Sequence, residues 1–133
     1  MHPDRHLIVM RLAPVVLVTG AAMLYVATVE WPGPYLVWNL LPMLVVMALA
    51  TVTLYRGGGR WNGTGWRWPL GTIGFALPAI GLSLYLHYAY AVDRGGMASE
   101  AIDPVGLFRY LPIFTMFAGA VGFAIGWIAG RNV

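Results

Sequence analysis

The chain has 133 residues, of which 59% are apolar and only 10% are charged. Soluble domains are typically about 25% charged, so a water-soluble fold of this length would lack the polar side chains needed to cover its surface. The formal charge of +3 comes from arginines that are spread along the chain, which argues against a nucleic-acid-binding protein. Cysteine is absent, which excludes disulfides and thiolate metal sites.

Four apolar segments are long enough to cross a membrane, since a helix of about 20 residues spans the hydrocarbon core. They cover residues 7–29, 35–55, 69–92 and 107–130. The first segment starts with charged residues, as a signal peptide does, but Tyr25-Val26-Ala27 is a poor cleavage site. The sequence therefore predicts an all-α membrane protein. Its single domain, residues 1–133, has four transmembrane helices arranged as two antiparallel hairpins.

The charged residues are divided unequally between the two sides of this arrangement. One side receives both termini and the 56–68 connection, and it carries six arginines and one aspartate, a net +5. The other side carries two arginines and four acidic residues, a net −2. Because arginine-rich segments stay in the cytoplasm, we expect both termini to be cytoplasmic. The predicted location is the cell inner membrane.

The first connection, residues 30–34, predicts a short turn on the outer side. Its two prolines and one glycine end one helix and allow the next to start. This interpretation assigns Glu30 to the turn, so no carboxylate is expected inside a membrane span. The outer connection 93–106 is longer and more polar, and its conformation is left open.

The connection 56–68 combines a glycine tract with tryptophans that alternate with arginines. We expect the glycines to make it mobile, and Trp61, Trp66 and Trp68 to lie at the level of the lipid headgroups. Such a belt is common at a cytoplasmic membrane boundary. Binding of an anionic lipid or a phosphate is the functional alternative.

The third segment carries a polar stripe that includes Ser83, His87 and Tyr90. In hydrocarbon these groups need partners, so the stripe should face the bundle interior or the outer interface. His87 is an ionisable residue well inside a span, which makes it a candidate site. Asn39 lies at a similar depth in the second segment and can meet it. Pro78 predicts a kink between the two halves of the third helix.

Polar side chains gather toward the outer leaflet, where they define a candidate ligand-binding site. Its members are Asn39, Ser83, Tyr85, His87, Tyr88, Tyr90 and Arg109. The structural alternative is that the tyrosines form an aromatic belt and His87 only satisfies a hydrogen bond.

The last segment contains glycines spaced for close helix packing. These are Gly119, Gly122, Gly126 and Gly130. Small residues let two backbones approach closely within a membrane. The partner helix belongs either to the same chain or to a neighbouring one, and the pattern does not choose between them.

No catalytic motif or cluster of metal ligands is present in the sequence, so we expect no catalytic residues, no metal site and no cofactor. His2 and His6 have helical spacing, but they lie near the terminus with only Asp4 nearby. Whether the chain is an enzyme stays open, although the missing motifs argue against it.

The sequence favours a non-enzymatic protein that acts through helix association. It would be a homo-oligomer or an accessory subunit of a membrane complex, with the lipid bilayer as its surroundings and no nucleic acid as a partner. The alternative is a small transporter, or a lipid- or quinone-binding protein, with an outward-facing polar pocket around His87.

Overall fold

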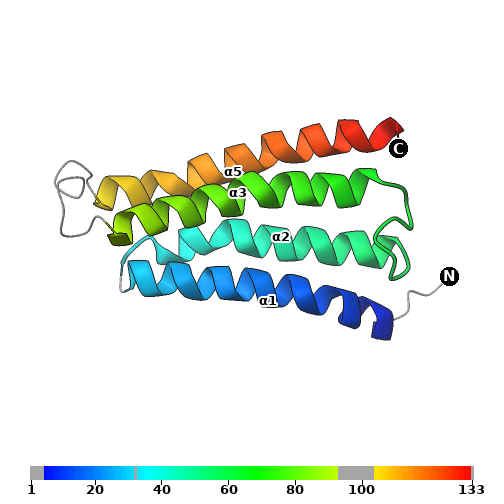
Figure 1. Ribbon diagram of the computed structural model, residues 1–133, viewed down its shortest axis with the longest axis horizontal. Helices are drawn as coiled ribbons and strands as arrows, with labels where there is room; N and C mark the ends of the chain where they lie inside the picture. The colour runs from blue at the N-terminus through cyan, green and yellow to red at the C-terminus, as the bar shows by residue number, and fades with distance from the viewer. Residues whose placement is uncertain (1–4, 32, 93–103, 133) are drawn as a thin grey trace.

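The computed structural model describes residues 5–31, 33–92 and 104–132. Within these ranges the chain forms α1 (Arg5–Glu30), α2 (Leu36–Arg56), α3 (Arg67–Val92) and α5 (Pro104–Ala129), followed by a 3-10 turn, η1 (Gly130–Asn132). The four α-helices lie side by side (Figure 1). Each is long and apolar enough to cross a membrane, which confirms the all-α membrane fold. The expectations for His2 and for the connection 93–103 lie outside the described residues.

The predicted bounds of the helices are close to the observed ones, but the assignment of Glu30 to a turn is wrong. Glu30 is the last residue of α1 and is buried. The helix continues because Trp31 still donates its backbone N–H to the carbonyl of Ala27 at 2.9 Å. The helix-breaking residues come only afterwards, at positions 32–34. A carboxylate is therefore enclosed within the helical bundle.

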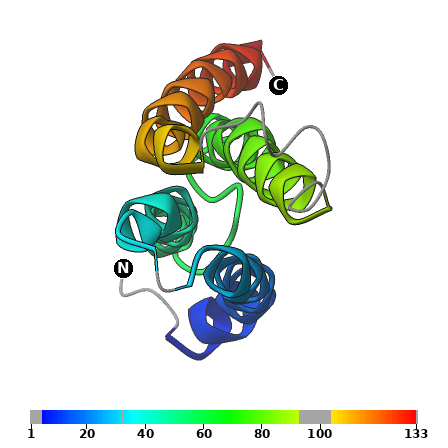
Figure 2. The same cartoon turned by 90° about the vertical axis from the view of Figure 1, so that its left-hand side faces the viewer.

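The helices form two closely packed pairs, α1 with α2 and α3 with α5, and α3 also contacts α2 and α1 (Figure 2). Two small apolar cores join the pairs. One is centred on Met43 and Val26, which pack with Ile80 of α3, and the other on Val46 and Phe75. These cores lie along the length of the bundle between the two polar ends.

The α3–α5 pair is the tightest because glycines line its contact. A Cβ atom on Gly122 would overlap the backbone of Gly74, and one on Gly126 would overlap the carbonyl of Leu70. A Cβ on Gly119 would lie 2.7 Å from the ring of Phe75. Gly130 is equally close to the backbone of Trp66. The structure thus places all four of these glycines against α3 of the same chain.

The connection 57–66, whose glycines predict mobility, contains successive turns. Gly58, Gly59 and Gly65 have φ angles of 66°, 96° and 102°, which side-chain-bearing residues rarely adopt. Gly59 also packs against Leu7, and its carbonyl accepts a 2.8 Å hydrogen bond from Arg11 Nη1. The glycines therefore allow this connection to fold back onto the start of α1.

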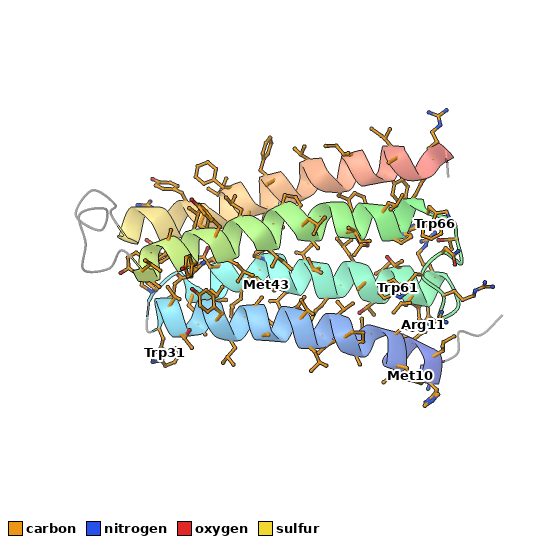
Figure 3. All side chains as sticks on the ribbon, in the orientation of Figure 1. Met10, Arg11, Trp31, Met43, Trp61 and Trp66 are labelled. Carbon is orange, nitrogen blue, oxygen red and sulfur yellow. The ribbon has the colours of Figure 1, made fainter. Side chains whose placement is uncertain are left out.

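The start of α1, the 57–66 connection and the end of α5 lie at one end of the bundle, which we call the arginine end (Figure 1). Figure 3 shows Arg11, Trp61 and Trp66 there, and Trp31 at the opposite end. We call that opposite end the Glu30 end. The arginine end carries Arg5, Arg11, Arg56, Arg60, Arg67 and Arg131.

Replacement of Gly122 by valine is expected to separate α3 from α5. The added side chain meets the backbone of Gly74, which cannot rotate away, so a loss of about 1–3 kcal/mol in the free energy of unfolding is expected. The matched control is Gly81→Ala in α3, where an added Cβ meets no atom within 4 Å. Unfolding in mixed micelles measures both variants, and equal stability of the two would contradict the role assigned to the glycine contact.

Candidate functional site

A buried contact between two titratable side chains, which we call the Glu30–His87 pair, joins α1 to α3 at the Glu30 end. His87 Nε2 lies 2.6 Å from Glu30 Oε2, and the two side chains are 0% and 1% exposed. The residues are 57 positions apart in sequence, so the contact depends on how the helices pack. A charge buried in this way is costly unless it is paired, and the contact provides that pairing.

Asn39 of α2 holds the second oxygen of the same carboxylate. Its Nδ2 donates to Glu30 Oε1 at 3.0 Å and to the carbonyl of Phe108 at 3.0 Å, with a longer contact to the carbonyl of Tyr35 at 3.3 Å. Because all three partners are acceptors, the amide NH₂ must face them. The amide oxygen, Oδ1, is buried and has no hydrogen-bond partner among the described residues.

The ring of His87 is fixed by three further contacts. Its Nδ1 lies 2.6 Å from the carbonyl of Ser83, with the Ser83 hydroxyl at 3.5 Å. The ring of Phe108 stacks on the imidazole, with centroids 5.0 Å apart and planes inclined by 18°. Tyr90 in turn packs edge-on against Phe108. The imidazole therefore has one orientation in which both nitrogens face acceptor atoms.

This geometry determines where the protons lie. A carbonyl oxygen only accepts, so Nδ1 of His87 carries a hydrogen. One more proton lies between Nε2 and Glu30 Oε2, either on the imidazolium opposite a carboxylate or on the carboxylic acid opposite a neutral imidazole. In both states the pair as a whole has no net charge. The site thus holds one proton that Glu30 and His87 share, and it is enclosed by the membrane-spanning helices.

The predicted site residues divide into two groups. Asn39, Ser83 and His87 are buried together, and Tyr90 reaches them through Phe108. Tyr85 and Tyr88 are 68% and 60% exposed, on the opposite face of α3. Arg109 is exposed and lies over the ring of Tyr110. These three residues do not join the others in a pocket.

Sequence reasoning did not identify Glu30 and Phe108 as members of the site. A signal for Glu30 is present, because the buried residues of α1 are Thr19, Ala22, Val26 and Glu30, which follow helical spacing. Extending that stripe by one more turn would have placed the carboxylate on the interior face. Phe108 enters the site through its backbone carbonyl and its ring position, which depend on how α5 packs.

Groups of three or more His, Cys, Asp or Glu side chains that could hold a metal ion do not occur in the described part of the chain. Beside the Glu30–His87 pair, Oδ1 of Asn39, which has no partner within the ranges that the structure describes, is an acceptor that a hydrogen-bond donor could occupy. No protein-family model, curated protein or solved structure matches the chain.

A double-mutant cycle on Glu30 and His87 measures the ion pair directly. Glu30→Ala or His87→Ala alone leaves a buried group without its partner and should reduce the free energy of unfolding by about 3–5 kcal/mol. The double variant should lose less than the sum of the two, because the isolated charge is also removed. Tyr88→Ala, at an exposed position of α3, is the control. Additive losses in the cycle would show that the two side chains do not interact.

Proposed function

We propose that the chain is a small multi-pass transporter of the inner membrane, in which protonation of the Glu30–His87 pair controls the contact between two helical hairpins. The hairpins are α1–α2 and α3–α5, arranged antiparallel with both termini in the cytoplasm. The observation that carries the proposal is the ion pair itself, buried where α1, α2, α3 and α5 converge. Ionisable groups enclosed in a membrane protein commonly belong to ion or proton pathways.

The position of the pair supports a role in changing conformation. Each hairpin has its own continuous contact, and between the hairpins the cores around Met43 and Val46 are apolar. Apolar contacts do not respond to protons. Among polar contacts between the hairpins, the hydroxyls of Thr53 and Thr72 pair at 3.2 Å without a titratable group. Protonation therefore acts on the contact at the Glu30 end.

The number of protons on the Glu30–His87 pair determines how the hairpins should respond to a change of pH. The pair is neutral with one shared proton, and a second proton leaves a protonated His87 opposite a neutral Glu30. That isolated positive charge is costly in a buried site and is stabilised when water reaches it. Acidification should therefore favour a state in which the hairpins separate at the Glu30 end, which opens an outward-facing site.

Association with another subunit is the second candidate function. Its support is that α1 is the least buried of the four helices within the chain. The glycine contact no longer supports it, because those glycines pack internally. Light scattering on the protein in mild detergent tests the homo-oligomer, which a monomeric mass would exclude.

The pH response can be measured by distances between spin labels, because the sequence contains no cysteine to remove. We expect the distance between labels at Leu24→Cys in α1 and Val92→Cys in α3 to increase from about pH 8 to about pH 5 in nanodiscs, because acidification supplies the second proton. Labels at Leu77→Cys and Ile125→Cys, within the α3–α5 hairpin, should keep a constant distance. Both pairs occupy exposed positions.

The same labels on a background with both Glu30→Gln and His87→Gln test the cause of the change. Glutamine can still form hydrogen bonds at both positions but cannot gain or lose a proton, so the distance should no longer depend on pH. An unchanged distance in the native background between the two pH values would overturn the proposed control by protonation.

The proposed orientation has its own test. An impermeant maleimide should label Trp31→Cys in intact spheroplasts and Asn62→Cys only after permeabilisation. Trp31 is 74% exposed at the Glu30 end, and Asn62 is exposed in the connection at the arginine end. The opposite labelling pattern would place the termini outside.

A further inference from the structure

A groove of about 590 Å³ lies between α1 and α3 and reaches the arginine end. Val15 and Val18 of α1 form one wall, and Ile73 and Ala76 of α3 form the other. Trp61 and Trp66 lie at its mouth, and Figure 3 shows both at that end. The volume is within the range of about 300–1,000 Å³ that is typical of sites for small molecules.

The surface of this groove is hydrocarbon, although two threonines contribute to it. The hydroxyl of Thr19 donates to the carbonyl of Val15 at 2.7 Å, and that of Thr72 donates to the carbonyl of Trp68 at 2.8 Å. Neither hydroxyl needs a hydrogen bond from an occupant. A hydrocarbon chain therefore fits the groove, whereas a polar ligand would lose its hydrogen bonds there.

The mouth of the groove has the opposite character. Arg11 lies one helical turn before Val15 and donates to the carbonyl of Gly59 at 2.8 Å, and Arg60 connects Gly59 to Trp61. The acidic residue among those the structure describes, Glu30, lies at the other end of the bundle. The indole N–H groups of tryptophan commonly donate to lipid headgroups, and each arginine near a membrane surface attracts anionic lipid. An apolar cavity below a positively charged rim is complementary to a lipid with an acidic headgroup.

We infer that this groove binds one acyl chain of an anionic phospholipid whose headgroup lies beside Arg11 and Arg60. The site is at the opposite end of the bundle from the Glu30–His87 pair and does not depend on the proposed transport function. A helix of a second protein could also fill an apolar groove, but it would not account for the arginines at the mouth.

Native mass spectrometry of the protein in detergent tests this site with palmitoyl-oleoyl-phosphatidylglycerol and the corresponding phosphatidylcholine. We expect one bound phosphatidylglycerol, retained roughly 30-fold more strongly than phosphatidylcholine, because each of the two arginines near the headgroup adds a roughly fivefold preference. Arg11→Gln with Arg60→Gln should remove this preference while leaving weak binding of both lipids.

Two size-matched variants locate the acyl chain. Ala76→Phe places a ring in the groove and should abolish retention of both lipids. Ala120→Phe, at an exposed position of α5 outside the groove, should leave retention unchanged. Quenching of tryptophan fluorescence by brominated phosphatidylglycerol gives a second measurement, and it should weaken in Trp61→Phe with Trp66→Phe.

Equal retention of the two lipids by the native protein would overturn the inference, as would equal losses in Ala76→Phe and Ala120→Phe. A change of oligomeric mass in Ala76→Phe without loss of lipid would show that a second protein helix occupies the groove, and would also overturn it. Circular dichroism establishes that each variant is folded before lipid is added.

Discussion

The contact between Glu30 and His87 is the constraint on which the arrangement of this bundle depends. A carboxylate enclosed in a membrane protein must be neutralised and hydrogen-bonded, and each of the surrounding helices contributes to this. α1 supplies the carboxylate, α3 the imidazole, and α2 the amide of Asn39. α5 supplies the carbonyl and ring of Phe108. The relative positions of the four helices at this end are thus set by one polar cluster.

Different interactions hold the helices together at the two ends of the bundle. At the Glu30 end the helices meet through buried polar groups, whereas at the arginine end they meet through aromatic and backbone contacts. Arg56 lies 5.5 Å from the ring centre of Trp68, and Arg67 lies at the same distance from Trp127. Such cation–π contacts hold the guanidinium groups beside the rings while leaving them accessible to solvent and lipid. One end is therefore suited to a buried proton and the other to surface charge.

The sequence predicted the helices well and the site only in part. Helix positions depend on the length of apolar runs and on proline and glycine punctuation, both of which are local. The inward orientation of Ser83 and His87 followed from helical periodicity. The partner of His87 was not predicted, because the first helix was expected to end one residue too early, which placed Glu30 in a solvent-exposed turn. Tyr85 and Tyr88 fall on a different stripe of the third helix from Ser83 and His87, and the structure leaves both of them, and Arg109, exposed.

The first helix is attached to the rest of the protein at two distant points. Near its start, Arg11 binds the carbonyl of Gly59, and at its last residue Glu30 binds His87. Between them α1 is the least covered of the helices. Release of Glu30 would leave the Arg11 attachment as a pivot, so displacement of α1 would grow with distance from it. Movement at the Glu30 end then widens the groove between α1 and α3 only slightly, which separates the two ends mechanically as well as chemically.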